Sequence, residues 1–244
     1  MKLADIAGNQ PTIKRLRNGL RATPPPNLYL VHGPTGAGKT TLANCLSRAH
    51  FCENRIAEGD ACGECDNCRL GLGAQSTYNR WTGAEIDQNF EWWVENRHFI
   101  LQSPDHSLFF DEIHDLCERH QSYLLTDLES ARCQIIFATS HVHRVNDAMQ
   151  TRFGANVIEL KRPSDPEVVL HLRKLCHELN VHANDLQLAA VVKGYKANLR
   201  QCTELIHAAI SQAGSVISSD FLESVFGTQS SPIASTQRFR SNNI

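Results

Sequence analysis

The sequence predicts an α/β protein with a mainly parallel sheet covered by helices on both faces, followed by a small domain made only of helices. Three observations lead to this prediction. Short apolar runs alternate with helical patterns through the first part of the chain. A glycine-rich loop ending in lysine lies between the first such run and a helix. After about residue 161, apolar residues recur at helical spacing only.

The first predicted element is a helix that begins near Pro11. Ile13, Leu16 and Leu20 fall on one face of such a helix, and proline is tolerated in a first helical turn. The prolines that follow end the helix and lead the chain into a short buried strand at residues 28–31.

Directly after this strand comes a P-loop: glycine, four residues, glycine, lysine, threonine. Gly33 and Gly38 let the backbone turn so that successive N–H groups point at an anion. Lys39 adds a charge for the β- and γ-phosphates, and Thr40 has the hydroxyl that ligates Mg²⁺. A chance glycine-rich turn is the alternative, but the helix that follows presents its N-terminus to the phosphates. We therefore expect ATP to bind at Gly33, Pro34, Thr35, Gly36, Ala37, Gly38, Lys39, Thr40 and Thr41.

A cysteine cluster follows the P-loop helix, within residues 52–68. Cys62, Cys65 and Cys68 are separated by two residues each, and Cys52 precedes the first of them by nine intervening residues. Four thiolates can converge on one tetrahedral Zn²⁺, so the pattern predicts a closed, structural zinc site, with free thiols in a loop as the alternative. The remaining cysteines are scattered, and we expect them to be small buried side chains: Cys45, Cys117, Cys133, Cys176 and Cys202.

The region 71–102 has the weakest pattern of the first domain. Its aromatic residues make it hydrophobic. We interpret them as core residues in preference to residues that stack on bases. Trp92 and Trp93 are adjacent, so on a helix one would pack inward while the other meets a neighbour or a partner.

Residues 107–112 predict a buried strand that ends in two acids. Opposite a P-loop, Asp111 would hold Mg²⁺ through water and Glu112 would polarise the attacking water. Alone, this pattern is a weak signal; together with the P-loop it is a strong one. His114 follows at the start of a helix, where we expect a surface or packing role.

Two further strands complete the predicted sheet, at residues 134–140 and 157–160, with a helix at 147–152 between them. The first of these strands ends in Thr139 and Ser140. Their hydroxyls could touch the nucleophilic water or the γ-phosphate, or simply form a turn.

The second predicted domain begins where the character of the chain changes, so that the core is assigned to residues 1–161 and the helical lid to residues 162–227. Residues 228–244 are rich in polar side chains and are predicted to be disordered. The lid helices are expected near residues 166–179, 183–192, 199–213 and 219–226, with Asp165 and Ser219 as N-caps and Gly194 and Gly227 as stops.

The composition is ordinary for a soluble globular protein, with 41% hydrophobic and 20% charged residues. A formal net charge of −2 excludes attraction of the whole protein to nucleic acid, so any DNA contact would come from a local basic face. No signal peptide or membrane-spanning apolar run is present, and we expect a cytoplasmic protein with no membrane partner and with reduced cysteines.

A P-loop domain with a cysteine cluster after its first helix, followed by a helical lid, resembles the AAA+ ATPases of bacterial clamp loaders, of the DNA polymerase III gamma/tau type. The likeness covers residues 4–227. It rests on the segment 4–10, on Glu85–Ile86–Asp87, on Asp111–Glu112–Ile113–His114 and on the helix at 124–129. The resemblance implies a P-loop AAA+ core with a parallel five-stranded sheet and a zinc-binding insert, plus a small all-helical lid.

The resemblance also implies three further site residues. Ser140 lies at the sensor 1 position, where the family usually has Thr or Asn. Arg152 would be an arginine finger acting on ATP bound to a neighbouring subunit, although Phe153 replaces the usual cysteine beside it. Arg200 resembles the sensor 2 arginine, which reaches the γ-phosphate from the lid. For both arginines an ordinary surface ion pair is the alternative.

By this resemblance the protein would be a Mg²⁺-dependent ATP hydrolase that works with other AAA+ clamp-loader-like subunits, a sliding clamp and primer-template DNA in replication. The alternative is a nucleotide-gated adaptor or loader of phage or mobile-element replication or recombination, with slow or incidental hydrolysis. Clamp-loader subunits continue into a third helical domain that this sequence lacks. It is therefore either a piece of a longer protein or a natural two-domain relative.

Overall fold

The computed structural model describes residues 1–69 and 77–227, and the chain divides into two compact units, Met1–Pro163 and Ser164–Ile244. Each unit has its own hydrophobic core. The predicted disorder of residues 228–244 lies outside the described residues.

The first unit contains a five-stranded sheet in the order β2-β3-β4-β1-β5, and every pair of neighbouring strands is parallel. The prediction of a parallel five-stranded sheet is therefore confirmed. The strands are β1 (Leu28–His32), β2 (Thr77–Thr82), β3 (His106–Asp111), β4 (Gln134–Thr139) and β5 (Val157–Glu159).

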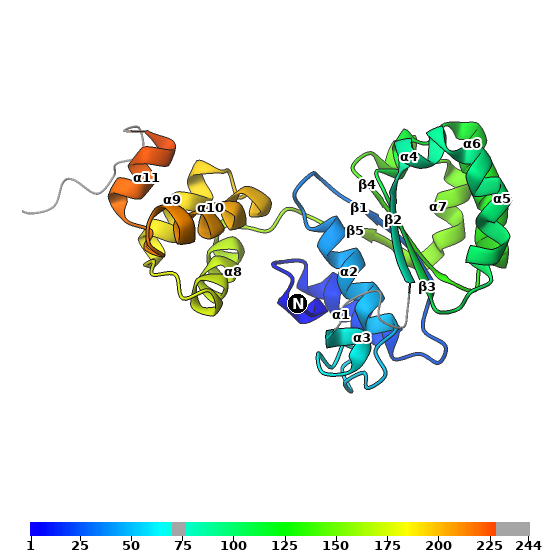
Figure 1. Ribbon diagram of the computed structural model, residues 1–244, viewed down its shortest axis with the longest axis horizontal. Helices are drawn as coiled ribbons and strands as arrows, with labels where there is room; N and C mark the ends of the chain where they lie inside the picture. The colour runs from blue at the N-terminus through cyan, green and yellow to red at the C-terminus, as the bar shows by residue number, and fades with distance from the viewer. Residues whose placement is uncertain (70–76, 228–244) are drawn as a thin grey trace, which may run out of the picture. The chain divides into compact units, whose positions relative to one another are not determined.

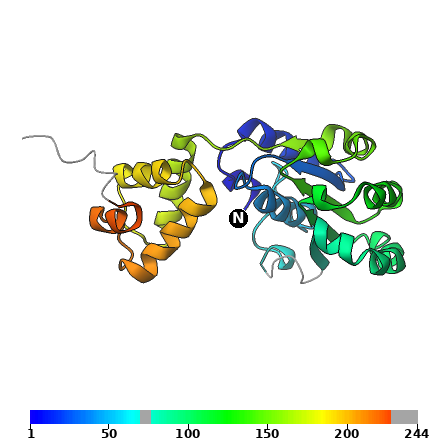
Figure 2. The ribbon, with the colours of Figure 1, turned by 90° about the horizontal axis from the view of Figure 1, so that it is seen from above.

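Helices cover both faces of this sheet (Figures 1 and 2). One face packs against η1 (Leu3–Asp5), α1 (Gln10–Leu20), α2 (Lys39–His50) and the cysteine cluster with α3 (Asp66–Arg69). The opposite face packs against α4 (Gly83–Gln88), α5 (Phe90–Leu101), η2 (Ile113–Asp115), α6 (Glu118–Ser130) and α7 (Asp147–Phe153). The short helices η3 (Val142–Arg144) and η4 (Gly154–Asn156) flank α7.

Successive residues of the central strands alternate between these two cores. Val31 belongs to the first core and Leu30 to the second; on β3, Phe109 belongs to the first and Phe110 to the second. A strand covered on both faces has no polar side, which is why these strands appear in the sequence as continuous apolar runs.

The region without a clear sequence pattern contains β2, α4 and α5. Trp93 is 1% exposed and its indole N–H donates to Asp127, whereas Trp92 is 42% exposed and its ring lies 5.3 Å from that of Trp81. The expected division between an inward and an outward tryptophan is confirmed. The expectation that all scattered cysteines are buried is wrong for Cys117, which is exposed because it precedes α6 at the surface.

The second unit is all-helical apart from one isolated bridge, between His182 and Val216, in its described part. Its helices are α8 (Asp165–Glu178), α9 (Asp185–Gly194), α10 (Leu199–Gln212) and α11 (Ser219–Phe226). Gly194 ends α9 where a Cβ would lie 2.5 Å from the ring of Phe226, so the close approach of α11 requires glycine.

The predicted N-caps of α8 and α11 are wrong by one residue. Ser164 caps α8 in a box with Glu167, and Ser218 caps α11 by accepting from the N–H of Phe221. Both serines have extended backbone angles, as an N-cap requires, whereas Asp165 and Ser219 already belong to their helices.

Candidate functional site

The P-loop joins β1 to α2, and its three glycines have backbone angles that favour glycine. Gly33 has φ +151°, and a Cβ there would lie 2.2 Å from the carbonyl oxygen of Leu160. Gly38 has φ +92° and precedes α2, with open space where a Cβ would be. Pro34, Thr35, Gly36 and Ala37 form the turn between them, and the first N–H groups of α2, which include those of Thr40 and Thr41, have no carbonyl one turn earlier to bond. This open, N–H-rich loop fits a phosphate chain.

Lys39 is the first residue of α2 and only 7% exposed. Its ammonium donates to the carbonyl oxygen of Gly33 at 3.0 Å and lies 3.8 Å from a carboxylate oxygen of Glu112. The charge is thus held directly over the loop, where it can move to a phosphate with little displacement.

The sheet order explains why two acids far along the chain meet this loop. Parallel strands have their carboxyl ends at one edge, and β4 lies between β3 and β1. Asp111 at the end of β3 accepts from the Thr40 hydroxyl at 3.4 Å. A hydroxyl and a carboxylate facing one another at the phosphate loop are an oxygen donor set that fits Mg²⁺, with water completing the shell.

Arg80 on β2 also binds Asp111, through a guanidinium–carboxylate contact of 2.7 Å to the same oxygen that Thr40 approaches. Sequence reasoning missed Arg80 because it did not find β2. The register that pairs Thr82 with Asp111 places Arg80 beside the end of β3.

Glu112 has a left-handed backbone (φ +49°) that turns its side chain toward β4. One carboxylate oxygen accepts from both the N–H and the hydroxyl of Ser140, each at 2.9 Å. Burial alone would raise the pKa of Glu112, but the two Ser140 donors, with Lys39 and His114, hold it below its ordinary value. The carboxylate is therefore ionised at neutral pH.

His114 lies against the same carboxylate, with Nδ1 3.1 Å from Glu112 and 3.1 Å from the hydroxyl oxygen of Thr139. Burial lowers the pKa of His114 more than Asp115 and Glu112 raise it, so the imidazole is neutral at pH 7. His114 was expected to have a surface or packing role, but in the structure its side chain also contacts the Glu112 carboxylate directly. Its position two residues after Glu112 was the available signal.

The two arginines expected from the family pattern lie on α7 and α10. Arg152 lies on α7 and forms an ion pair of 3.5 Å with Glu129, with 40% of its side chain exposed. Arg200 is an exposed residue in the first turn of α10, in the other unit, after the N-cap Asn198. Within the first unit, the structure brings together Lys39, Thr40, Asp111, Glu112 and Ser140.

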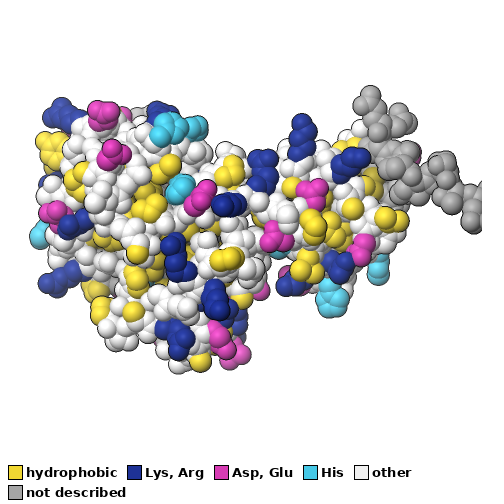
Figure 3. Space-filling model, turned by 180° about the vertical axis from the view of Figure 1, so that it is seen from behind, with side chains coloured by type: hydrophobic (Ala, Val, Ile, Leu, Met, Phe, Trp, Pro, Cys, Tyr) yellow, Lys and Arg dark blue, Asp and Glu magenta, His cyan; other side chains and the backbone are white. Residues whose placement is uncertain are grey.

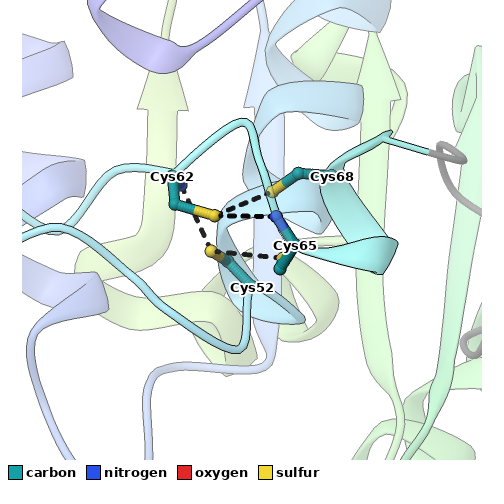
Figure 4. A group of neighbouring side chains, drawn as sticks. All are labelled: Cys52, Cys62, Cys65 and Cys68. Carbon is teal, nitrogen blue, oxygen red and sulfur yellow. Dashed lines mark hydrogen bonds between the residues drawn. The ribbon is translucent and has the colours of Figure 1, made fainter.

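The four cysteines of the predicted zinc site do converge (Figure 4). The Sγ atoms of Cys52 and Cys65 are 3.9 Å apart, as are those of Cys62 and Cys68. Around a tetrahedral Zn²⁺ with bonds of about 2.3 Å, sulfur atoms are separated by about 3.8 Å. The cluster therefore fits zinc with almost no rearrangement.

Backbone N–H groups prepare the cluster for a cation. Cys62 Sγ accepts from the N–H groups of Cys65 and Glu64, both at 3.3 Å, and these donors lower the pKa of Cys62 to about 6. Cys52 Sγ accepts from the N–H of Cys62 at 3.2 Å. Thiolate ligands are stabilised by such donors, which is the arrangement that a structural metal site needs.

A buried carboxylate ties this cluster to the N-terminus. Asp60, fully buried, accepts from the N–H groups of Leu3, Ala4 and Ala61 at 2.9–3.0 Å, and Arg17 lies 3.7 Å away. The cysteine loop is therefore packed against η1 and α1, next to the helix that begins at the P-loop.

A parallel five-stranded sheet with a P-loop, two strand-end acids and a following helical unit defines the class: the chain has the fold of an AAA+ protein. Solved structures agree. RuvB of Thermotoga maritima superposes with a TM-score of 0.66 at 19% identity, over 91% of this chain and 70% of that one. A further structure, titled the Thermotoga maritima RuvB Holliday junction branch migration motor, gives 0.65 at 18% identity.

By sequence, the chain is tau/gamma-like. It is 24% identical to DNA polymerase III subunit tau/gamma of Haemophilus influenzae over 92% of its length, and 26% identical to DNA polymerase III subunit gamma of Buchnera aphidicola (from Acyrthosiphon pisum) over 85%. A model of the family described as DNA polymerase III, delta subunit, matches residues 8–79. The resemblance expected from the sequence is thus confirmed.

The chain spans about a third of the Haemophilus protein and 58% of the Buchnera protein. Among the described residues, no helix combines the length and apolarity that crossing a membrane would require. On the face of the first unit seen in Figure 3, basic side chains are scattered among acidic and uncharged ones rather than gathered into one stripe.

Proposed function

We propose that the first unit binds ATP with Mg²⁺ and hydrolyses it as one subunit of a clamp-loader-like AAA+ assembly. The observation that carries this proposal is the meeting of Lys39, Thr40, Asp111, Glu112 and Ser140 at one edge of the sheet. The likeness to tau/gamma subunits supports the same conclusion.

Each residue has a task that its position suits. Lys39 and the N–H groups at the start of α2 bind the phosphates, while Thr40 and Asp111 would hold Mg²⁺, which neutralises charge on the β- and γ-phosphates when bound. Glu112 orients and polarises the attacking water, and Ser140 positions the Glu112 carboxylate through two hydrogen bonds. The cysteine cluster would hold Zn²⁺ and stabilise the unit without touching the reacting atoms.

The remaining site residues act from other places. Arg152 is exposed and forms a surface ion pair with Glu129, a weak contact that it could exchange in order to complete the site of a neighbouring subunit as an arginine finger. Such a finger contributes about 10³–10⁵ in rate. Arg200, at the start of α10, would sense the γ-phosphate, as its resemblance to the sensor 2 arginine implies. Partners would be further AAA+ subunits, a sliding clamp and primer-template DNA, in the cytoplasm.

A nucleotide-gated adaptor with slow hydrolysis is the second candidate, and one observation favours it. Both acids are already engaged, Asp111 by Arg80 at 2.7 Å and Glu112 by Ser140 at 2.9 Å. An isolated chain with its acids so paired would turn over slowly until a partner releases them.

Nucleotide binding and turnover, measured separately, test the proposal. Lys39→Ala should abolish ATP binding in calorimetry, and Glu112→Gln should leave binding intact while lowering kcat by about 10²–10⁴. Lys174→Ala, an exposed lysine of α8, is the matched control and should change neither. Unchanged turnover in Glu112→Gln would remove the proposed role of this acid.

Adding partners separates the two candidates. Stimulation of the ATPase rate by a sliding clamp together with primed DNA would support clamp loading. A rate that stays low with both present would favour the adaptor, and absence of ATP binding would overturn both.

A further inference from the structure

We infer that a second metal site lies on the opposite face of the sheet from the cysteine cluster, formed by Asp87, Cys117 and His120. Asp87 is in the last turn of α4, Cys117 directly precedes α6, and His120 is in the first turn of α6. These three residues, the Asp87 triad, would bind Zn²⁺ or a similar divalent transition ion. The inference does not depend on the proposed ATPase function.

The triad is compact enough for one ion. One ligand atom from each residue lies within 4.8 Å of the others, and His120 Nδ1 is 2.7 Å from Asp87 Oδ1. Zinc bonds of about 2.0–2.3 Å place neighbouring ligands about 3.3–3.8 Å apart. Closing the triad around an ion therefore requires side-chain shifts of about 1 Å or less, and displaces the proton between His120 and Asp87.

Neighbouring contacts fix the ligands in place. The imidazole of His120 stacks on the ring of Phe90, with centroids 3.6 Å apart and an interplanar angle of 6°. Asp87 accepts from the N–H of Cys117 at 3.1 Å, which orients its carboxylate. The helix α4 is itself fixed by the capping box between Thr82 and Glu85. Ligands that are held before the ion arrives lose little conformational entropy on binding.

The Cys117 thiol faces the Asp87 carboxylate and hydrogen-bonds to it. Cys117 is the N-cap of α6, a position that favours Ser, Thr, Asp or Asn, and its side chain makes no capping hydrogen bond. Asp87 supplies an acceptor to the N–H of Cys117 instead. The N–H and thiol of Cys117 and the imidazole of His120 therefore all converge on Asp87, and the exposed thiol adds a sulfur ligand to the oxygen and nitrogen ligands.

The ligand types select the ion. One thiolate, one imidazole and one carboxylate suit zinc and related ions, whereas Mg²⁺ and Ca²⁺ prefer oxygen ligands only. His120 and Asp87 are half-buried and Cys117 is exposed, so a fourth position is open to water. This open site contrasts with the closed Cys52–Cys62–Cys65–Cys68 cluster. Binding releases the thiol proton of Cys117.

Cobalt(II) titration of the whole chain, kept reduced and first loaded with one equivalent of Zn²⁺, tests the inference. Zinc fills the four-cysteine cluster first, because four thiolates bind it more tightly than one. Added Co²⁺ should then give a saturable thiolate-to-cobalt absorption, about a quarter as intense per metal as that of the four-cysteine cluster, since one thiolate takes part instead of four.

Variants assign the second site. Cys117→Ser should abolish the thiolate-to-cobalt absorption, and Asp87→Asn and His120→Ala should each weaken Co²⁺ binding by at least about tenfold. His98→Ala, an exposed histidine of α5, is the matched control and should bind as the parent does. Circular dichroism checks that each variant folds. If His120→Ala unfolds, Cys117→Ser still tests the site, because Cys117 is exposed and its substitution should not disturb the fold.

Two results would overturn the inference: no saturable absorption after zinc loading, or an absorption that persists in Cys117→Ser. The metal content of the parent chain, compared with that of Cys62→Ser, shows whether the four-cysteine cluster binds metal. If that cluster binds no metal, Cys62→Ser leaves the stoichiometry unchanged, and the triad variants still report on their own site.

Discussion

The cysteine cluster and the nucleotide site differ in how far apart their residues lie in the chain. Three of the four cysteines fall within seven residues, and backbone N–H groups of the same loop bind their sulfurs. At the nucleotide site, Thr40 and Asp111 are 71 residues apart and Glu112 and Ser140 are 28 apart. The first site is a local structure whose sulfur atoms lie at a spacing that fits zinc; the second exists only when the whole sheet has formed.

The chemistry of the two sites differs in the same way. The cysteine cluster gathers groups of one kind, which repel one another as thiolates until a cation joins them. The nucleotide site already contains both charges, with Lys39 beside Glu112 and Arg80 beside Asp111. On the proposed function, the first site would depend on a bound ion for its stability, and the second would exchange its internal ion pairs for contacts with nucleotide and Mg²⁺.

Removing metal from the cysteine cluster should have the largest of the predicted effects on stability. If it had no effect, the contrast between the two sites would be lost. Chelation, or Cys65→Ser, should destabilise the first unit by at least about 3 kcal/mol, because structural zinc contributes about 10–16 kcal/mol in small zinc-finger peptides. Calorimetry follows the transition, and the second unit, which has its own core, is the internal control. Equal melting with and without chelator would mean that the cluster does not depend on a metal.

The Asp60 carboxylate tests whether the cysteine loop is independent of its surroundings. Asp60→Ala should cost about 3 kcal/mol, because three backbone N–H groups lose their acceptor and Arg17 loses a buried partner. Urea unfolding measures the change. Glu58→Ala, an exposed acid of the same loop, should be nearly neutral; a similar loss in both variants would assign the effect to charge alone.

Gly33 tests how strongly the nucleotide site depends on the backbone conformation of the P-loop. Gly33→Ala should cost about 2–3 kcal/mol and lower ATP affinity, since the new Cβ would meet the Leu160 carbonyl at 2.2 Å. Gly19→Ala, within α1, is the matched control, because the nearest atom to its new Cβ would be Pro26 Cγ at 3.9 Å. This substitution should stabilise the protein by about 0.5–1 kcal/mol. Thermal melting with and without ATP separates folding from binding.

The smallest expected effect concerns a purely local feature of the second unit. The N–H and hydroxyl of Ser164 lower the pKa of Glu167. A lowered carboxyl pKa stabilises the fold above the ordinary pKa of glutamate, and this contribution is lost as the pH falls through the folded-state value. Glu167→Gln should therefore lower the melting temperature slightly at pH 7 and not at about pH 3.

Glu178→Gln, at the far end of α8 and outside the capping box, is the control for this measurement. A Glu167→Gln variant with the same deficit at both pH values would mean that the capping box acts through shape, not through charge.

Features within a few residues of one another could be predicted from the sequence, whereas the edge strand β2 and the contacts that it makes could not. The strand β2 escaped notice because it is an edge strand with polar residues, Asn79 and Arg80, where the central strands are apolar. With β2 unrecognised, nothing in the sequence linked Arg80 to Asp111. Likewise, the spacing of Asp87, Cys117 and His120 matches no metal motif, because α4 and α6 bring them together only in three dimensions.

The amino-acid sequence alone determined the P-loop, the four-cysteine cluster, the acidic end of β3 and the change to an all-helical second unit. Each of these depends on backbone conformation or hydrophobic periodicity over a short stretch. Only the tertiary structure decided that Ser140 and His114 hold Glu112, that Arg80 pairs with Asp111 and that Asp60 anchors the cysteine loop. The contacts of Glu112 and Asp111 follow from strand order and register, and that of Asp60 from the packing of the cysteine loop against η1; both bring distant parts of the chain within hydrogen-bond distance.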